Sequence, residues 1–304
     1  MAIDPKEIKR VKGEGFLLNR GTDKFSGRIV TGNGTLSARQ MKCACEAAER
    51  FGDGTMAFTS RMTVEFPGIY FDDIPKFQEY IAQEGMFTGG TGAKVRPVVC
   101  CKGSTCVFGL YDTQELCAEI HERFYDGYHD VALPHKFKIA CGGCPNNCVK
   151  PDINDFGIVG QAVPVIDESV CKTCRKCQVE MNCPMHAVRR LSDGKVAIDT
   201  SICNNCGRCV GNCPFKAIGR KETLFKIYVG GRWGKHIRMG TVLHGLHTKT
   251  EALDMIEKAL LLFKSEGMAG ERFGNMIDRL GVDYVQRMLT SDELLSRKAE
   301  VLSR

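Results

Sequence analysis

The cysteines are the residues through which this sequence could do chemistry. The chain has 304 residues and 17 cysteines. Two short segments hold five of these cysteines, Cys100-Cys101-Lys-Gly-Ser-Thr-Cys106 and Cys144-Pro-Asn-Asn-Cys148. Thiolates from two such turns can together hold one [4Fe–4S] cluster. The sequence therefore predicts a redox centre with the ligands Cys106, Cys144, Cys148 and one of Cys100 and Cys101.

Eight further cysteines form an internal repeat. Cys171-x2-Cys174-x2-Cys177-x5-Cys183-Pro is followed by Cys203-x2-Cys206-x2-Cys209-x3-Cys213-Pro. The repeat resembles two-cluster bacterial ferredoxins, in which the fourth cysteine of each half ligates the other cluster. One cluster would take Cys171, Cys174, Cys177 and Cys213, and the other Cys203, Cys206, Cys209 and Cys183. Zinc sites also use C-x2-C pairs, but the duplication with a Cys-Pro ending favours iron–sulfur clusters.

Composition limits the class of protein. The net charge of +6 is too small to indicate a nucleic-acid partner by itself. Residues 1–16 are charged throughout and lack the apolar core of a secretory signal, and no apolar run is long enough to span a membrane. So many cysteines without a secretory signal indicate metal ligation in a reducing compartment rather than disulfides. We therefore expect a cytoplasmic protein, and oxygen-sensitive clusters suggest an anaerobic organism.

The surrounding pattern predicts an α+β fold. In the first ninety residues, Ser37 caps a helix over residues 38–51, and strands are expected at 55–60 and 62–66. A helix then starts at Asp72 or Asp73 and ends near Gln83. Strands at 94–99 and 133–139 would deliver the cysteine pairs, with a helix from Asp112 to about Tyr125 between them. Further expected elements are strands at 156–166 and 225–229, a helix from Thr250 to about Ser265, and two shorter helices.

Several motifs outside the cysteines resemble siroheme-dependent sulfite and nitrite reductases, whose sites combine C-x5-C with C-x3-C. Ser26-Gly-Arg28-Ile-Val-Thr-Gly-Asn-Gly34 resembles the strand of that family that carries a siroheme-facing arginine. Thr59-Ser60-Arg61 resembles its Thr-x-Arg motif, and Leu133-Pro-His-Lys136-Phe-Lys138 its Pro-x-Lys-Phe-Lys strand. The likeness covers nearly the whole chain and is strongest to the catalytic C subunits of anaerobic sulfite reductases and to dissimilatory-type proteins with an inserted ferredoxin.

The resemblance implies roles for individual residues. Cys148 would also be the axial ligand of the siroheme iron. Arginine side chains bind carboxylates bidentately, so Arg28, Arg61 and Arg96 would face the eight carboxylates of siroheme. Strand alternation puts Lys136 and Lys138 on one face, where they would line the anion pocket. Arg61, Arg96, Lys136 and Lys138 would thus act in catalysis, and the alternative for each is an exposed surface charge.

The resemblance also narrows the choice of the first cluster ligand. Cys100 gives the x5 spacing to Cys106, whereas Cys101-Lys-Gly103 fits the Cys-x-Gly pattern of the family. Neighbouring residues at a strand end point to opposite faces. We predict Cys101 as the ligand and Cys100 as a buried free thiol.

The implied organisation has three parts: a ferredoxin-like half-domain at 1–92, a siroheme and [4Fe–4S] domain at 93–165 and 221–304, and an inserted ferredoxin domain at 166–220. The implied cofactors are siroheme and three [4Fe–4S] clusters. The implied activity is six-electron reduction of sulfite to sulfide, with electrons entering through the insert. The alternatives are nitrite reduction with the same cofactors and an electron-transfer polyferredoxin without siroheme. An electron-donor protein or partner subunits are expected, and a second copy or related chain should supply the missing half-domain repeat.

Overall fold

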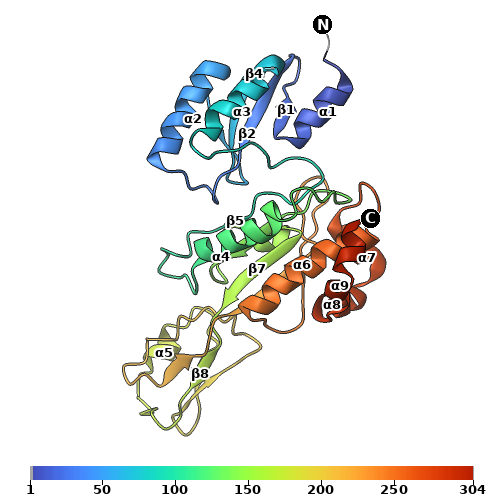
Figure 1. The fold of residues 1–304 in the computed structure, drawn as a ribbon. Helices are drawn as coiled ribbons and strands as arrows, with labels where there is room; N and C mark the ends of the chain where they lie inside the picture. The colour runs from blue at the N-terminus through green and yellow to red at the C-terminus, as the bar shows by residue number, and fades with distance from the viewer. Residues whose placement is uncertain (1–2, 304) are drawn as a thin grey trace.

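The structure, a computed structural model, describes residues 3–303. The predicted α+β class is confirmed, because helices and strands alternate through three successive tiers. Figure 1 shows the N-terminal unit in blue at one end, a larger central unit in green and orange, and a small cysteine-rich lobe in yellow at the other end. The two outer tiers therefore contact opposite sides of the central unit.

The N-terminal unit is an antiparallel sheet with helices packed on it. The strand order is β1-β2-β4-β3, and Phe16, Phe66 and Phe77 are among its fully buried residues. The cap predicted at Ser37 is confirmed, because its side chain forms a capping box with Gln40. The elements are α1 (Pro5–Gly13), β1 (Phe16–Leu18), β2 (Lys24–Ile29), α2 (Ala38–Phe51), β3 (Ala57–Phe58), β4 (Val64–Tyr70), a 3₁₀ turn (Phe71–Asp73) and α3 (Ile74–Ala82).

The strand predicted over 62–66 starts later and runs further, as β4 (Val64–Tyr70). The continuation passes through Pro67, which cannot donate a ladder hydrogen bond. The register between β2 and β4 shifts between Phe25 and Gly27, opposite this proline. The irregularity accommodates a proline inside the sheet.

The central unit is a five-stranded sheet of order β13-β12-β7-β6-β5, in which β5, β6 and β7 are parallel. Its strands are β5 (Val99–Cys100), β6 (Ile139–Gly142), β7 (Phe156–Gln161), β12 (Leu224–Val229) and β13 (Thr241–Val242). The strand predicted at 94–99 is regular only from Val99, where β5 begins. Before that, Pro97 lacks an N–H to donate, and Val95 forms an isolated bridge to Phe137. The strand predicted over 133–139 likewise becomes regular only at Ile139.

Helices cover the central sheet. The cap of the long helix α6 lies two residues before the predicted one, because Thr248 rather than Thr250 forms a capping box with Glu251. The helix predicted from Asp112 to Tyr125 is α-helical only to Ile120 and continues as a π-helical turn. The elements are α4 (Thr113–Ile120), the π turn (His121–Asp126), a 3₁₀ turn (Pro151–Ile153), α6 (Lys249–Glu266), α7 (Phe273–Leu280), α8 (Val282–Thr290), α9 (Glu293–Ser296) and α10 (Lys298–Ser303).

The cysteine-rich lobe leaves the central sheet after β7. The strand predicted over 156–166 is split in two, because Ala162 pairs with Cys206 instead of continuing the central sheet. The lobe has a small core of Val179, Val188 and Ile218. Its elements are β8 (Pro164–Ile166), α5 (Gln178–Met181), β9 (Val188–Arg190), β10 (Val196–Ile198) and β11 (Ile218–Arg220), and Figure 1 shows α5 and β8 in it.

Candidate redox site

The parallel pairing of β5 and β6 brings the two cysteine segments together. Cys100 pairs with Cys141, so the residues that follow both strands meet at one edge of the sheet. The Cys101 N–H donates to the Cys141 carbonyl at 3.2 Å, and the Gly143 N–H donates to the Cys101 Sγ at 3.1 Å. The sulfur of Cys101 therefore lies against the turn that leads into Cys144.

The loop between Cys101 and Cys106 is held closely against the same edge. The Thr113 hydroxyl donates to the Cys101 carbonyl at 2.7 Å. Gly109 closes the loop, because a Cβ on it would lie 1.9 Å from the Gly103 carbonyl oxygen. A residue with a side chain at 109 would therefore distort the loop that carries Gly103 and Cys106.

The four predicted cluster ligands lie near one another. The pKa of Cys144 is raised by burial and also by the nearby thiols of Cys101, Cys148 and Cys106. No group of three His, Cys, Asp or Glu side chains within residues 3–303 is arranged around a single metal ion. An iron–sulfur cube takes one thiolate on each of its irons, so its four ligands surround a larger body than one ion. These four thiols suit a cluster rather than a lone metal.

Cys100 points away from this group and into the core. It is 2% exposed, and its Sγ accepts a hydrogen bond from the Asn33 Nδ2 at 2.7 Å. The Asn33 Oδ1 also accepts from the Cys100 N–H, at 2.6 Å. Cys101 therefore stays the predicted ligand, and Asn33 is a contact that no spacing in the sequence indicated.

Lys136 and Lys138 lie just before β6, whose other end leads to Cys144. Phe137 between them is fully buried while both lysines are half-buried, as the alternation predicts. Neither ammonium group has a hydrogen bond or ion pair with another residue of the described chain. Burial, then Arg61 and Lys136, lowers the pKa of Lys138 to about 8. The pair can therefore bind an anion, and Lys138 can release a proton near neutral pH.

The predicted arginines lie on the same side but already have partners in the protein. The Arg61 guanidinium donates to Asn154 Oδ1 at 2.7 Å and to the carbonyls of Pro97 and Ile139 at 2.7 and 2.9 Å. These contacts join the N-terminal unit to the central sheet. Arg96 donates to the Gly90 and Gly92 carbonyls, and Arg28 pairs with Glu65 at 2.6 Å. The Nε atoms of Arg61 and Arg96 are buried and have no partner among the residues that the structure describes, so each retains an N–H for a further acceptor.

Two residues of this region were missed in the sequence. Asp155 is fully buried, and Arg272 donates to both of its carboxylate oxygens, at 2.9 and 3.0 Å. The same carboxylate accepts the N–H of Lys138 at 3.0 Å. No short-range sequence pattern links these residues, because Asp155 and Arg272 are 117 positions apart in the sequence.

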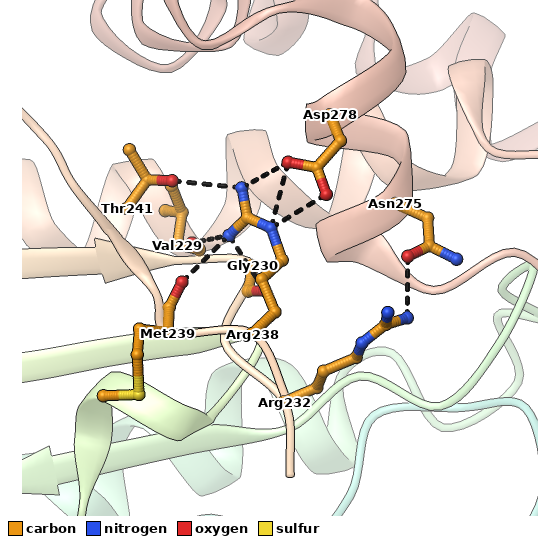
Figure 2. Close-up of polar contacts among 8 residues, drawn as sticks. All are labelled: Val229, Gly230, Arg232, Arg238, Met239, Thr241, Asn275 and Asp278. Atoms are coloured by element: carbon orange, nitrogen blue, oxygen red, sulfur yellow. Dashed lines mark hydrogen bonds and ion pairs between the residues drawn. The ribbon is translucent and has the colours of Figure 1, made fainter. Parts of the chain in front are cut away.

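The turn after β12 is fixed on α7, next to Arg272. Figure 2 shows the Arg238 guanidinium between Asp278, Thr241 and the carbonyls of Val229, Gly230 and Met239. In the same view Arg232 reaches Asn275 Oδ1, at 2.6 Å. The Gly230 N–H donates to the Asp155 carbonyl at 2.8 Å. The turn at Gly230–Arg232 thus lies against the segment that holds Lys138.

In the cysteine-rich lobe, one predicted set of ligands shares a pocket. Cys183, Cys203, Cys206 and Cys209 all line it, although Cys183 comes from the other half of the repeat. Burial, with the thiols of Cys203, Cys206 and Cys183, raises the pKa of Cys209 to about 11. A second cavity, of about 330 Å³, is lined by Cys206 on one side and by Cys144 on the other. This half of the repeat therefore faces the site at the sheet edge.

The fold and the paired cysteine turns define an α+β redox protein with an iron–sulfur domain. The family description "Nitrite and sulphite reductase 4Fe-4S domain" matches residues 91–298, and "Nitrite/Sulfite reductase ferredoxin-like half domain" matches residues 19–84. The chain belongs to the family of siroheme sulfite and nitrite reductases, which confirms the resemblance seen in the sequence.

Individual relatives agree with this assignment. The chain is 30% identical to the C subunit of the anaerobic sulfite reductase of Salmonella typhimurium, over 97% of this chain and 92% of that one. It is 31% identical to the coenzyme F420-dependent sulfite reductase of Methanocaldococcus jannaschii, over 82% of this chain and 39% of that one. The crystal structure of dissimilatory sulfite reductase I superposes with a TM-score of 0.71 at 22% identity, covering 88% of this chain and 69% of that one, and so shares the fold. Within residues 3–303, no helix is both long and apolar enough to cross a bilayer.

Proposed function

We propose that this chain is a siroheme-dependent sulfite reductase that reduces sulfite to sulfide by six electrons. The observation that carries the proposal is the placement of Lys136 and Lys138, two cations without protein partners, at one end of β6, with four clustered thiols at the other. A single ion could not contact both groups, because a four-residue strand spans roughly 13 Å. A large cofactor with anionic substituents fits this arrangement.

The residues present fit the proposed cofactors. Cys101, Cys106, Cys144 and Cys148 would hold the catalytic [4Fe–4S] cluster, and Cys148 is exposed, as a thiol shared with a second cofactor needs to be. Arg28, Arg61, Arg96, Lys136 and Lys138 would contact siroheme carboxylates or the substrate. Siroheme, when bound, supplies the iron at which sulfite is reduced. The chain itself supplies positive charge for the dianion and protons from lysine.

The proposed domains follow the expected boundaries: a half-domain at 1–92, a siroheme domain at 93–165 and 221–304, and a two-cluster ferredoxin insert at 166–220. The shared pocket of Cys183 with Cys203, Cys206 and Cys209 supports the exchange of the fourth ligand between the halves. Cys171, Cys174, Cys177 and Cys213 would then hold the other cluster. The insert would be the entry point for electrons, and the abundance of thiols favours a reducing cytoplasm.

Metal analysis and a visible spectrum of anaerobically purified, fully loaded protein test the proposal. Three clusters and one siroheme give about thirteen irons per chain, together with a Soret band and a long-wavelength band. About eight irons without siroheme bands would instead support the electron-transfer polyferredoxin. Turnover with sulfite and with nitrite in parallel distinguishes the two substrates, and a preference for nitrite would overturn the sulfite assignment.

A further inference from the structure

The two halves of the cysteine-rich insert differ in charge. Between its cysteines the first half carries Lys172, Arg175 and Lys176, where the second half carries Asn204, Gly207 and Arg208. After the fourth cysteine, Lys216 occupies the position that His186 occupies in the other half. Because the fourth ligands cross over, the cations Lys172, Arg175, Lys176 and Lys216 all belong to the segments proposed to hold one cluster. We call these four residues the basic face.

The basic face is exposed and its charges are unpaired. All four side chains are exposed, and none has a hydrogen bond or ion pair with another residue of the described chain. Three other cations of the insert have partners: Lys195 pairs with Glu168 at 2.7 Å, Arg190 with Glu180 at 3.5 Å, and Arg208 stacks on Phe108 at 4.7 Å. Arg189 on β9 and Arg220 on β11 are exposed and unpaired within residues 3–303, but both lie outside the cysteine turns. Among the residues that lie between or directly after the cysteines, the unpaired charge therefore belongs to the segments of one of the two proposed clusters.

That cluster lies on the half of the insert that does not face the central unit. The second half packs on the central unit, since the Ala162 N–H donates to the Asn205 carbonyl at 2.8 Å and Gly207 contacts Ala162 and Leu110. The first half contacts the insert's own hairpin instead, through the bond from Arg190 to the Cys174 carbonyl at 2.9 Å. Figure 1 shows the insert as a lobe that projects from the central unit, so its first half is open to a partner.

We propose that the basic face is the docking surface for an acidic electron-donor protein. The inference rests on the proposed function, because it assigns a cluster to Cys171, Cys174, Cys177 and Cys213. Two exposed apolar side chains flank the cations in sequence, Met181 at 65% and Phe215 at 45% exposure. A partly apolar patch with charges around it is typical of protein interfaces. Complementary charge also accelerates encounter by about 10 to 10³-fold, and salt screens this effect.

Stopped-flow reduction of the oxidised protein tests the proposal. The probe is a reduced, acidic bacterial ferredoxin, and the readout is bleaching of cluster absorbance. The variant is Arg175→Glu/Lys176→Glu, and the matched control is Lys6→Glu/Lys9→Glu on α1, where both lysines are exposed. At low ionic strength we expect the variant to react at least about tenfold more slowly than wild type. The wild-type rate should fall with added salt, the variant rate should change little, and the control should match wild type.

Several outcomes would overturn the proposal. One is an unchanged rate in the variant, and another is an equal loss in the control. Reduction by methyl viologen at high ionic strength reports cluster damage. The double substitution Lys172→Gln/Lys216→Gln provides a milder variant. The docking proposal is also contradicted if, in both variants, the reduction rate with viologen falls as much as the rate with ferredoxin. A further contradicting result is that the basic face binds phosphatidylglycerol vesicles in a charge-dependent way while the substitutions leave the ferredoxin kinetics unchanged. That result would indicate that the basic face binds a membrane surface rather than a donor protein. Cluster bleaching does not require sulfite turnover, so failure of the docking face is distinguishable from failure of the sulfite reductase proposal.

Discussion

Asp155 and Arg272 form a buried ion pair, at 2.9 Å, immediately behind the backbone of Lys138. One carboxylate accepts from Arg272 and from the Lys138 N–H, while the Asp155 carbonyl accepts from Gly230. The pair therefore joins three segments that are distant in sequence: the lysine segment, the turn after β12 and the start of α7. The position of the Lys138 side chain depends on this junction.

Removing one member of this pair should destabilise the protein strongly. Arg272→Met would leave the fully buried Asp155 carboxylate without its cation, which costs about 3–5 kcal/mol for a broken buried pair. Anaerobic guanidinium denaturation followed by circular dichroism measures the loss. Arg297→Met removes an exposed pair with Glu300, whose side chains are 44% and 49% exposed, and should change the free energy of unfolding far less, because solvent screens that pair. Equal losses of unfolding free energy in the two variants would show that the buried pair stabilises the protein no more than the exposed pair.

The two neighbouring cysteines should respond differently to substitution. Cys101→Ser should remove the catalytic cluster, because its Sγ lies against the Gly143 turn that leads to Cys144. Cys100→Ser should keep the cluster, because its Sγ is directed at Asn33 in the core. Iron content and the electron paramagnetic resonance of the reduced protein report each result. If only Cys100→Ser loses the cluster, Cys100 is the ligand, with the x5 spacing to Cys106, and the assignment of Cys101 is wrong.

Asn33 should contribute to the attachment of the N-terminal unit. Its amide bonds the Cys100 N–H and Sγ and the Gln114 Oε1, at 2.6, 2.7 and 2.9 Å. Asn33 also has a φ of 55°, so an alanine there would add backbone strain. Asn33→Gly removes the side chain without that strain and should cost about 1–3 kcal/mol, because a buried N–H loses its acceptor. A change below about 0.5 kcal/mol in the same denaturation assay would show that water replaces the amide.

Local signals predicted a large part of this structure. The cap of α2 at Ser37 was predictable because a cap and the first turn of its helix lie within a short stretch of sequence. The duplicated C-x2-C-x2-C run is equally local, and its assignment to clusters stays a prediction. The same reasoning placed the start of α6 at Thr250, whereas Thr248 caps it, because both residues are good caps and only Thr248 has a glutamate three positions later.

The contacts that the sequence did not predict are long-range. Asn33 and Cys100 are 67 positions apart, and Asp155 and Arg272 are 117 apart. No periodicity or motif pairs such residues, since their contact depends on how the tiers pack. The same is true of the predicted arginines. Their motifs indicated cofactor contacts, but the sequence did not predict the hydrogen bonds that they form with the protein, such as that from Arg61 to Asn154.

The single half-domain should be completed by a second chain. The half-domain description matches residues 19–84, and we expect another chain to supply a second copy of this half-domain. Trp233, Ile237 and Met239, on the turn after β12, are 63%, 56% and 54% exposed, as expected of a surface that a second chain covers. Light scattering of the loaded protein should give a multiple of 33.6 kDa, or a complex with a related chain. A monomer with full sulfite turnover contradicts this prediction.

Lys138 should act as the proton donor, and its pKa gives the pH dependence. Burial, Arg61, Lys136 and Arg272 lower the pKa to about 8, and only Asp155 among the neighbouring charges opposes them. The ammonium is therefore protonated below about pH 8 and loses its proton above it. If it donates protons as S–O bonds break, sulfite turnover with a chemical reductant should be constant below that pH and fall above it.

Substitution separates this role from cofactor binding. Lys138→Met, and likewise Lys136→Met, should leave the siroheme spectrum intact but lower sulfite turnover by at least about a hundredfold, the usual range for a positioned acid. Lys138→Met should also lose the decline near pH 8, because the ammonium group with that pKa has been removed. Lys226→Met, at a half-buried lysine of β12, should retain both the rate and the pH profile of the wild type. Wild-type rates in both lysine variants with siroheme normally bound would mean that Lys136 and Lys138 are an exposed surface and that the anion binds elsewhere.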